Sequence, residues 1–297
     1  MGLLDILNAG KIRKENEQLK AENQRLINQM KELGVTEYYQ TKEKMTQEMI
    51  QTKIDSVPVG TKMYKNKILG LRGKATGLVF SIFNPVVHCI TKEQAKTFLR
   101  DRNNGQQDEW FTIFTSGMDT SYSTKSLDTI AMSFSGITNK GRYVLLNERV
   151  YNNAEIGVPL APSDIAKRYY EFLERNREDW GLARNVFIDS ADAATITELN
   201  KFKREHPQCL YIFNPAWKKM QIIDRIILQL GWMNYNEEKK VEPDFYIVDD
   251  CSTYKSELNK YSWLEDKDQE PEDGNDHMIN SVQYGWIPYA GQIGVKK

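Results

Sequence analysis

Three aspartates and one histidine stand at the ends of expected strands and helices, where side chains that do chemistry are often found. Asp119 follows an expected strand in "SGMDTSYS", and Asp189 follows another in "VFIDSA". Asp276 and His277 open an expected helix in "NDHMINS", after an acidic loop. Because the ends of strands converge at one rim of a sheet, we expect these four side chains to lie close together.

Carboxylates gathered beside an imidazole are suited to hold a hard divalent cation such as Mg²⁺ or Mn²⁺. Two such ions about 3.5–4 Å apart can activate water and stabilise the leaving oxygen during phosphodiester cleavage. His277 would add a ligand or shuttle a proton. Taken singly, each aspartate is more often a turn former or a helix N-cap, and His277 a capping or surface residue. The combination indicates a two-metal site.

The elements that must position these residues follow from the hydrophobic pattern. Residues 109–135 and 141–150, rich in aromatic and β-branched side chains, predict three successive strands. A helix is expected over 163–180 with Ser163 as its N-cap, followed by strands at 185–191 and 209–216 and helices at 192–206 and 218–233. The last of these is expected to bury Ile222, Ile223, Ile226, Ile227 and Leu230.

A last strand is expected in "DFYIVDD", a helix in "CSTYKSELNKYSW", and a final helix from Asp276. A three-stranded meander followed by alternating helices and strands predicts an α/β fold with a mixed sheet. Asp128, Glu148 and Asp192 are secondary candidates for the acidic rim, although we expect Glu148 to be an exposed strand residue.

The first part of the chain has a different pattern. Ile12, Leu19, Leu26 and Leu33 recur every seventh residue, which predicts a coiled-coil helix over 1–35. It would either associate with a second copy of itself or lie as a single amphipathic helix on its own domain. We expect residues 36–109 to form a helical and loop-containing connection and residues 110–297 to form the catalytic domain. Lysines and an arginine at 62–74 form either a basic face for DNA or a solvated loop.

Composition limits the classes of function. The net charge of −1, from 40 basic and 41 acidic residues, gives no overall attraction to nucleic acid, so any DNA contact must be local. No window has the roughly 18 apolar residues of a membrane span, and the start of the chain is too briefly apolar for a signal peptide. We therefore expect a cytoplasmic protein without a membrane partner. The three cysteines have no CxxC spacing and are expected to be ordinary thiols.

Five segments carry a resemblance to a known family. They occur in the order and spacing of the nuclease domain of the large terminase subunit of tailed bacteriophages, across residues 110–290: "GMDTSYSTKSLDTIAM", "VFIDSADAATITELNKF", "NPAWKKMQIIDRI", "KSELNKYSW" and "NDHMINSVQYG". The resemblance implies a ribonuclease H-like fold and a two-metal endonuclease that cuts concatemeric phage DNA during packaging. It also implies double-stranded DNA, a packaging ATPase, a small terminase subunit and a portal as partners.

Carried over by residue, the resemblance implies that Asp119 and Asp189 are metal ligands and that Asp276 and His277 are the acidic and histidine pair of the last helix. It implies that Lys218 or Lys219 meets a DNA phosphate. Asn280 departs from the family, which commonly has an aspartate three residues after the histidine; an amide is a neutral and weaker metal ligand.

A second departure is larger. Complete terminases carry an amino-terminal ATPase, whereas this sequence has no GxxxxGK[ST] motif and a short predicted coiled coil in that place. Either the motor is a separate polypeptide, or the sequence is a partial or rearranged gene product. Two alternative functions stay open: a catalytically weak or inactive assembly or adaptor protein of the packaging machine, and another ribonuclease H-like DNA enzyme such as a resolvase or transposase.

Overall fold

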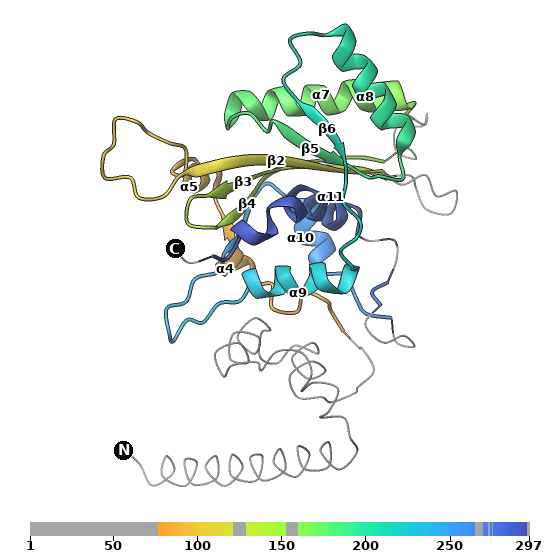
Figure 1. Ribbon diagram of the computed structural model, residues 1–297. Coiled ribbons are helices and arrows are strands. Elements are labelled where there is room, and N and C mark those ends of the chain that lie inside the picture. The colour runs from red at the N-terminus through yellow and green to blue at the C-terminus, as the bar shows by residue number, and fades with distance from the viewer. Residues whose placement is uncertain are drawn as a thin grey trace, which may run out of the picture. The chain divides into compact units, whose positions relative to one another are not determined.

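The computed structural model describes residues 77–120, 129–152, 160–264, 270–272, 274 and 276–295 (Figure 1). The predicted coiled coil, the lysines at 62–74 and Asp128 lie outside these residues. In the described part, seven strands form one sheet in the order β1-β7-β4-β3-β2-β5-β6. The strands are β1 Cys89–Ile90, β2 Phe111–Thr120, β3 Thr129–Thr138, β4 Tyr143–Asn152, β5 Asn185–Ile188, β6 Ile212–Pro215 and β7 Phe245–Val248.

Strand directions identify the fold. Strands β2, β3 and β4 form an antiparallel meander, whereas β5 and β6 continue the sheet parallel to β2. On the other side, β7 is parallel to β4 and β1 is parallel to β7. The central order β4-β3-β2-β5-β6, in which β3 alone runs opposite, is the ribonuclease H-like arrangement. The predicted mixed α/β fold class is confirmed.

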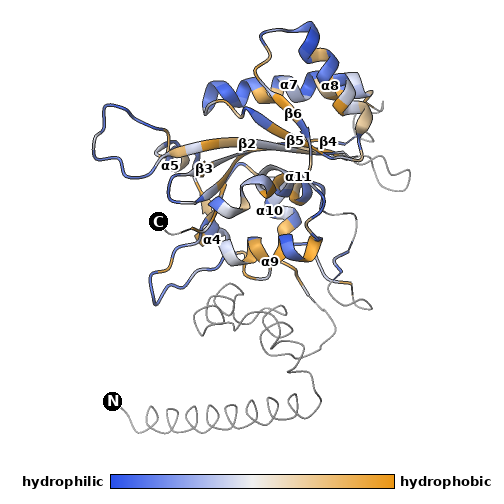
Figure 2. Ribbon diagram, viewed as in Figure 1, coloured by the Kyte–Doolittle hydropathy of each residue, from blue (hydrophilic) through white to orange (hydrophobic). Residues whose placement is uncertain are grey.

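Helices cover both faces of this sheet (Figure 1). On one face lie α7 Pro162–Asp179 and α8 Ala193–Glu205, and on the other lie α9 Ile222–Trp232, α10 Ser252–Leu258 and α11 His277–Trp286. The short helices α4 Pro85–His88 and α5 Lys92–Lys96 flank β1, and a 3₁₀ segment η2 Ile287–Gln292 follows α11. The outward sides of α7 and α8 are mostly hydrophilic (Figure 2), as expected for helices that bury one stripe.

Part of the segment predicted as a connection belongs to this folded body. Strand β1 joins the sheet through β7, and Val79, Phe80 and Ala95 are buried in its core. None of the helices in the described ranges combines the length and hydrophobicity of a membrane-crossing segment.

Two helix starts differ from expectation. The N-cap of α7 is Ala161 rather than Ser163, because Pro162 occupies the first turn and the Asp164 carboxylate accepts the Ala161 amide at 3.2 Å. Helix α9 begins at Ile222 rather than at 218, and Ile222 is 44% exposed instead of buried. Ile226 and Leu230 are buried as predicted.

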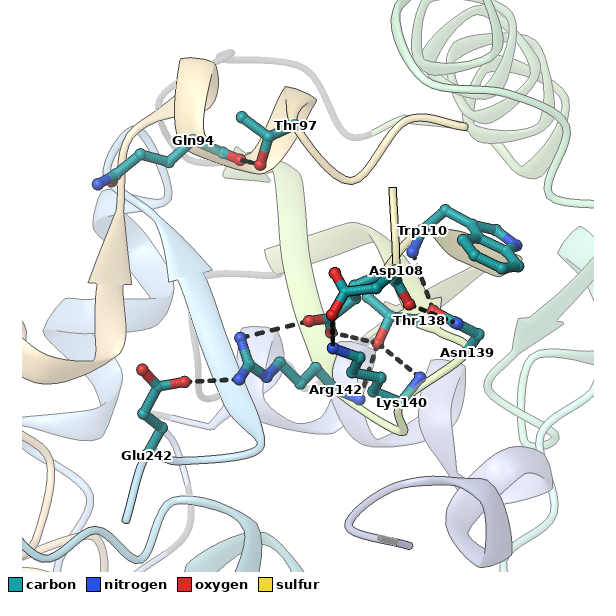
Figure 3. A network of polar contacts seen from close by, with 10 residues as sticks. Gln94, Thr97, Asp108, Trp110, Thr138, Asn139, Lys140, Arg142 and Glu242 are labelled. Atoms are coloured by element: carbon teal, nitrogen blue, oxygen red, sulfur yellow. Dashed lines mark hydrogen bonds and ion pairs between the residues drawn. The ribbon is translucent and has the colours of Figure 1, made fainter. Parts of the chain in front are cut away.

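The end of the sheet away from Asp119 is tied together by polar contacts around the β3–β4 turn (Figure 3). Lys140 forms an ion pair with Asp108 at 2.5 Å, and Arg142 contacts both Glu242 at 2.5 Å and Glu109 at 3.5 Å. The exposed Lys140–Asp108 pair contributes about 0–1 kcal/mol. Glu109 is buried, and its carboxylate also accepts the Thr138 hydroxyl, so these contacts hold the turn in place.

Gly117 determines how closely α11 can approach the sheet. A Cβ on Gly117 would lie 1.8 Å from the carbonyl oxygen of Ser281 on α11, so only glycine fits there. The Ser281 hydroxyl lies 2.9 Å from the Gly117 carbonyl oxygen and 3.0 Å from the Ser133 hydroxyl on β3. The last helix is therefore docked directly on the backbone of β2.

We expect Gly117→Ala to lower the free energy of unfolding by about 3 kcal/mol or more, since the backbone of α11 would have to move away from β2. Gly285→Ala, on the facing helix, is the matched control. Its Cβ would meet nothing closer than 3.4 Å, and alanine favours the helix by about 1 kcal/mol. Urea denaturation measures both variants, and equal losses of stability would contradict this account of the helix–strand contact.

Candidate active site

Asp119 and Asp189 are neighbours across two parallel strands. Met118 on β2 is in register with Ile188 on β5, and each aspartate is the next residue along its strand. The Asp189 amide donates to the Met118 carbonyl oxygen at 2.9 Å. Asp119 and Asp189 are 5% and 7% exposed, so both carboxylates lie at the protected edge of the sheet.

Helix α11 brings Asp276 and His277 to the same edge. Asp276 is the N-cap residue and is 8% exposed, and His277 Nδ1 lies 3.1 Å from Asp119 Oδ2. The Asn280 side-chain amide donates to Asp276 Oδ2 at 3.1 Å. Residues 158 positions apart in the chain are thus in direct contact.

The charges of these groups influence one another. Burial raises the pKa of Asp119, and the nearby charges of Asp189 and Asp276 raise it further, whereas the hydrogen bond with His277 opposes the shift. The same hydrogen bond raises the pKa of His277, despite its partial burial. A proton shared by the two residues is therefore retained to a higher pH than on an isolated imidazole.

The two lysines differ in position. Lys218, in the turn before α9, places its ammonium 2.5 Å from Asp189 Oδ1 and 5.6 Å from the ring centre of Tyr284. Lys219 is exposed and makes no ion pair with any described residue. Lys218, one of the two lysines that the resemblance assigned to a DNA phosphate, thus pairs with the Asp189 carboxylate in this structure.

Sequence reasoning missed two further residues of the site. Tyr284 lies two helical turns after His277 on α11, and its pKa is raised by burial and by the nearby charges of Asp119 and Asp189. Arg225 on α9 is 6% exposed and lies close enough to interact with the charges of Asp119 and Asp276. The sequence signal that could have found Arg225 is its place on the buried stripe of α9, one turn before Gln229, because a charged residue is rarely buried without a partner.

Glu257 supports the position of α11. Its carboxylate, on α10, accepts hydrogen bonds from the Met278 and Ile279 backbone amides at 3.1 and 2.9 Å. These amides are in the first turn of α11, where backbone donors have no partner within the helix. Burial raises the pKa of Glu257 to about 7. Glu148 has a similar role for α10 and accepts the Thr253 and Tyr254 amides, so its expected exposure on β4 is wrong.

The residues fit a hard cation in chemistry, since three buried carboxylates and one imidazole supply oxygen and nitrogen donors. Within the described ranges, however, no group of three or more His, Cys, Asp or Glu side chains surrounds a common point in a way that could hold a metal ion. In this structure Lys218 contacts Asp189 and His277 contacts Asp119. A cation would have to displace or share these contacts.

Comparisons with known proteins extend the description. No family model matches the sequence, and no curated protein matches it. The solved large terminase of a thermophilic bacteriophage, in complex with ADP, is 18% identical, with 82% of this chain and 52% of that chain covered and a TM-score of 0.58. The matched part of this chain has the fold of the corresponding half of that phage large terminase. Another structure of the same terminase gives 17% identity, 80% and 51% coverage and a TM-score of 0.57.

At this level of identity, the terminase likeness establishes the fold and not the activity. The chain spans about half the length of the thermophilic phage terminase. The resemblance read from the sequence is confirmed for the terminase fold. The nuclease domain of the g2p large terminase from bacteriophage SPP1, with bound Mn, is 16% identical over 60% of this chain and 87% of that domain, with a TM-score of 0.40.

The raised pKa of Glu257 predicts how the stability of the folded protein depends on pH. Its ordinary pKa of 4.5 applies to the unfolded chain, so between pH 4.5 and about 7 the folded protein holds a proton that the unfolded chain has lost. Its contribution to stability is therefore complete below pH 4.5 and is lost as pH rises to 7, by about 3 kcal/mol in total.

We expect Glu257→Gln to remove this loss, so that the variant gains stability relative to the parent as pH rises from 5 to 8. Denaturant unfolding across that range is the measurement. Glu178→Gln, on the exposed surface of α7, is the control and should follow the parent at every pH. A constant difference between Glu257→Gln and the parent would rule out the titration of Glu257 in this range.

Proposed function

We propose that this chain is a metal-dependent DNA endonuclease that cuts concatemeric phage DNA during genome packaging. The observation that supports it is the meeting of Asp119, Asp189, Asp276 and His277 at one edge of a sheet that has the terminase fold. Since the chain spans about half of the terminase it is similar to, the role in packaging is itself a proposal.

Asp119, Asp189 and Asp276, with His277, would hold two Mg²⁺ or Mn²⁺ ions. When bound, such ions supply an activated water and stabilise the leaving oxygen of the cleaved phosphodiester. The burial of the three aspartates supports cation binding, because carboxylates in a medium of low dielectric constant repel one another until cations neutralise them. His277, hydrogen-bonded to Asp119, would hold a proton beside the reacting phosphate.

Lys218 and Lys219 would contact the DNA backbone. The Lys218 ammonium neutralises Asp189, and on cation binding it would be released toward a phosphate. Lys219, next to it and exposed, would add a second phosphate contact. Such contacts position DNA without reading its sequence. The proposed partners are double-stranded DNA, a separate packaging ATPase, a small terminase subunit and the portal, all in the cytoplasm of the bacterial host.

A second candidate function is a catalytically weak or inactive assembly or adaptor protein of the packaging machine. The observation that favours it is Asn280, whose amide occupies Asp276 Oδ2 where the family commonly has a metal-binding carboxylate. A purified-protein assay separates the two functions, because an adaptor would cut DNA weakly or not at all.

We expect the protein to nick plasmid DNA in the presence of Mn²⁺. Asp119→Asn and Asp189→Asn should each lower the rate about 1,000-fold, equivalent to about 4 kcal/mol of lost transition-state stabilisation. Asp108→Asn, an exposed carboxylate before the start of β2, is the control and should cut at the parental rate. A folded parent that leaves the plasmid intact would refute the endonuclease and support the adaptor.

We expect Asn280→Asp to bind Mn²⁺ about 10-fold more tightly than the parent, since it adds a carboxylate within reach of Asp276. Without metal, the variant should be less stable, because two neighbouring carboxylates repel. Isothermal titration calorimetry measures the affinity and thermal melting measures the stability. Asn280→Ala, which removes the amide without adding charge, is the control; a rise in affinity for that variant as well would show that charge is not the cause.

A further inference from the structure

A cavity of about 200 Å³ lies between β4 and α7 and is lined by three arginines, Arg149, Arg168 and Arg175. Arg149 is on β4, whereas Arg168 and Arg175 are seven residues apart on α7 and so lie along one side of it, about 10 Å apart along its axis. In a chain with a net charge of −1, this local concentration of guanidinium groups is unusual.

The cavity is on the face of the sheet opposite to the candidate active site. Asn147 of β4 bonds Asn176 of α7 at 2.9 Å, so Arg149, two residues later, also points toward α7. Glu148, between them, points to the other face and bonds the backbone of α10. Asp119 shares that other face, since it is two residues from Gly117, which contacts α11.

Although the faces differ, the cavity is at the same rim of the sheet as the active site. Ala131 of β3 is in register with both Asp119 of β2 and Val150 of β4. Arg149 therefore lies one residue from the level of Asp119 and two strands away, about 10 Å across the sheet. Each DNA strand carries a phosphate about every 3.4 Å of helix axis, so a duplex lying at Asp119 presents further phosphates about 10 Å along its axis.

An aromatic ring orients two of these arginines. Arg149 and Arg168 both lie over the ring of Tyr151, at 5.5 and 4.8 Å from its centre, which orients each guanidinium through its face. Among the described residues, none of the three arginines has an ion-pair partner. In contrast, Arg177 of the same helix pairs with Glu174.

The rest of the cavity suits an oxyanion. The amide of Asn176, 1% exposed, and that of Asn147 form a polar floor with their mutual hydrogen bond. Three arginines and two acids, Glu148 and Glu171, line the cavity, so positive charge exceeds negative. The Glu148 carboxylate is also held by the backbone amides of α10. Planar guanidinium groups donate paired hydrogen bonds that match phosphate oxygens.

We propose that this arginine cavity binds backbone phosphates of duplex DNA and holds the duplex across the rim while another phosphate lies at Asp119 and Asp189. This inference rests on the proposed function for its choice of ligand, because the same guanidinium groups would also accept a free nucleotide or inorganic phosphate. The site would fix the position of the duplex and would not read its sequence.

The test is DNA binding by the full-length protein in EDTA, where no cleavage occurs, measured by fluorescence anisotropy of a labelled duplex over a range of NaCl concentrations. The variant with Arg149→Gln, Arg168→Gln and Arg175→Gln should bind at least about 10-fold more weakly at low salt. Its slope of log affinity against log salt should be smaller by about 2.7, since three phosphate contacts are lost. The single variant Arg149→Gln, at an exposed strand position, should lose about 0.9 of that slope and guards against misfolding of the triple variant.

A matched control carries the same charge change elsewhere. Arg102→Gln, Arg184→Gln and Arg204→Gln replace three exposed arginines outside the cavity lining, and this variant should retain the parental slope. Equal losses in the two triple variants, or parental binding by the cavity variant, would overturn the proposal. Binding of ATP or inorganic phosphate that depends on the cavity arginines, together with unchanged DNA binding, would also overturn it and assign the cavity to a free phosphate.

Failure of this inference can be told apart from failure of the endonuclease. If the cavity variant binds DNA like the parent and Mn²⁺-dependent nicking still requires Asp119, the cavity proposal is wrong and the nuclease proposal stands. If the parent binds DNA with the expected dependence on the arginines but cuts nothing, the cavity proposal stands and the adaptor function is favoured.

Discussion

The contact between α11 and the backbone of β2 at Gly117 is the constraint on which the rest of the site depends. Because no side chain separates the two elements, the helix approaches closely enough for Ser281 to bond both β2 and β3. His277, one turn before Ser281, and Tyr284, one turn after it, then face the same edge of the sheet, and His277 contacts Asp119. A bulkier residue at 117 would move the whole helix and every side chain that it presents.

The second organising factor is the cost of burying negative charge. Asp119, Asp189 and Asp276 are each less than a tenth exposed, and a buried carboxylate needs a counter-charge or hydrogen bonds. In this structure Lys218 and His277 provide the direct contacts, and buried Arg225 adds a positive charge nearby. The same electrostatic demand explains why divalent cations are the natural complement of this edge, and why they would compete with the chain's own cationic groups.

Alternation of side chains along β4 separates two kinds of surface. Glu148 turns inward to cap α10 and so helps to position the layer that carries α11, whereas Arg149 and Tyr151 turn to α7 and form a positively charged cavity. One strand thus supports the acidic edge on one face and presents cations on the other, within one residue of the same level of the sheet. A polyanion that crosses the rim would meet both.

The sequence by itself predicted the three-stranded meander and the alternating helices and strands after it. It also singled out Asp119, Asp189, Asp276 and His277 as candidate site residues. Both predictions were possible because hydrophobic periodicity and the residues that end each element are local properties. The start of α9 at Ile222 and the N-cap of α7 were misplaced, since both depend on one or two residues whose preferences tertiary contacts override.

Only the tertiary structure decided that Lys218 pairs with Asp189, that Tyr284, Arg225 and Glu257 join or support the site, and that three arginines from β4 and α7 share a cavity. These contacts join residues far apart in the chain, and their geometry follows from how closely the layers pack. No local pattern encodes that distance.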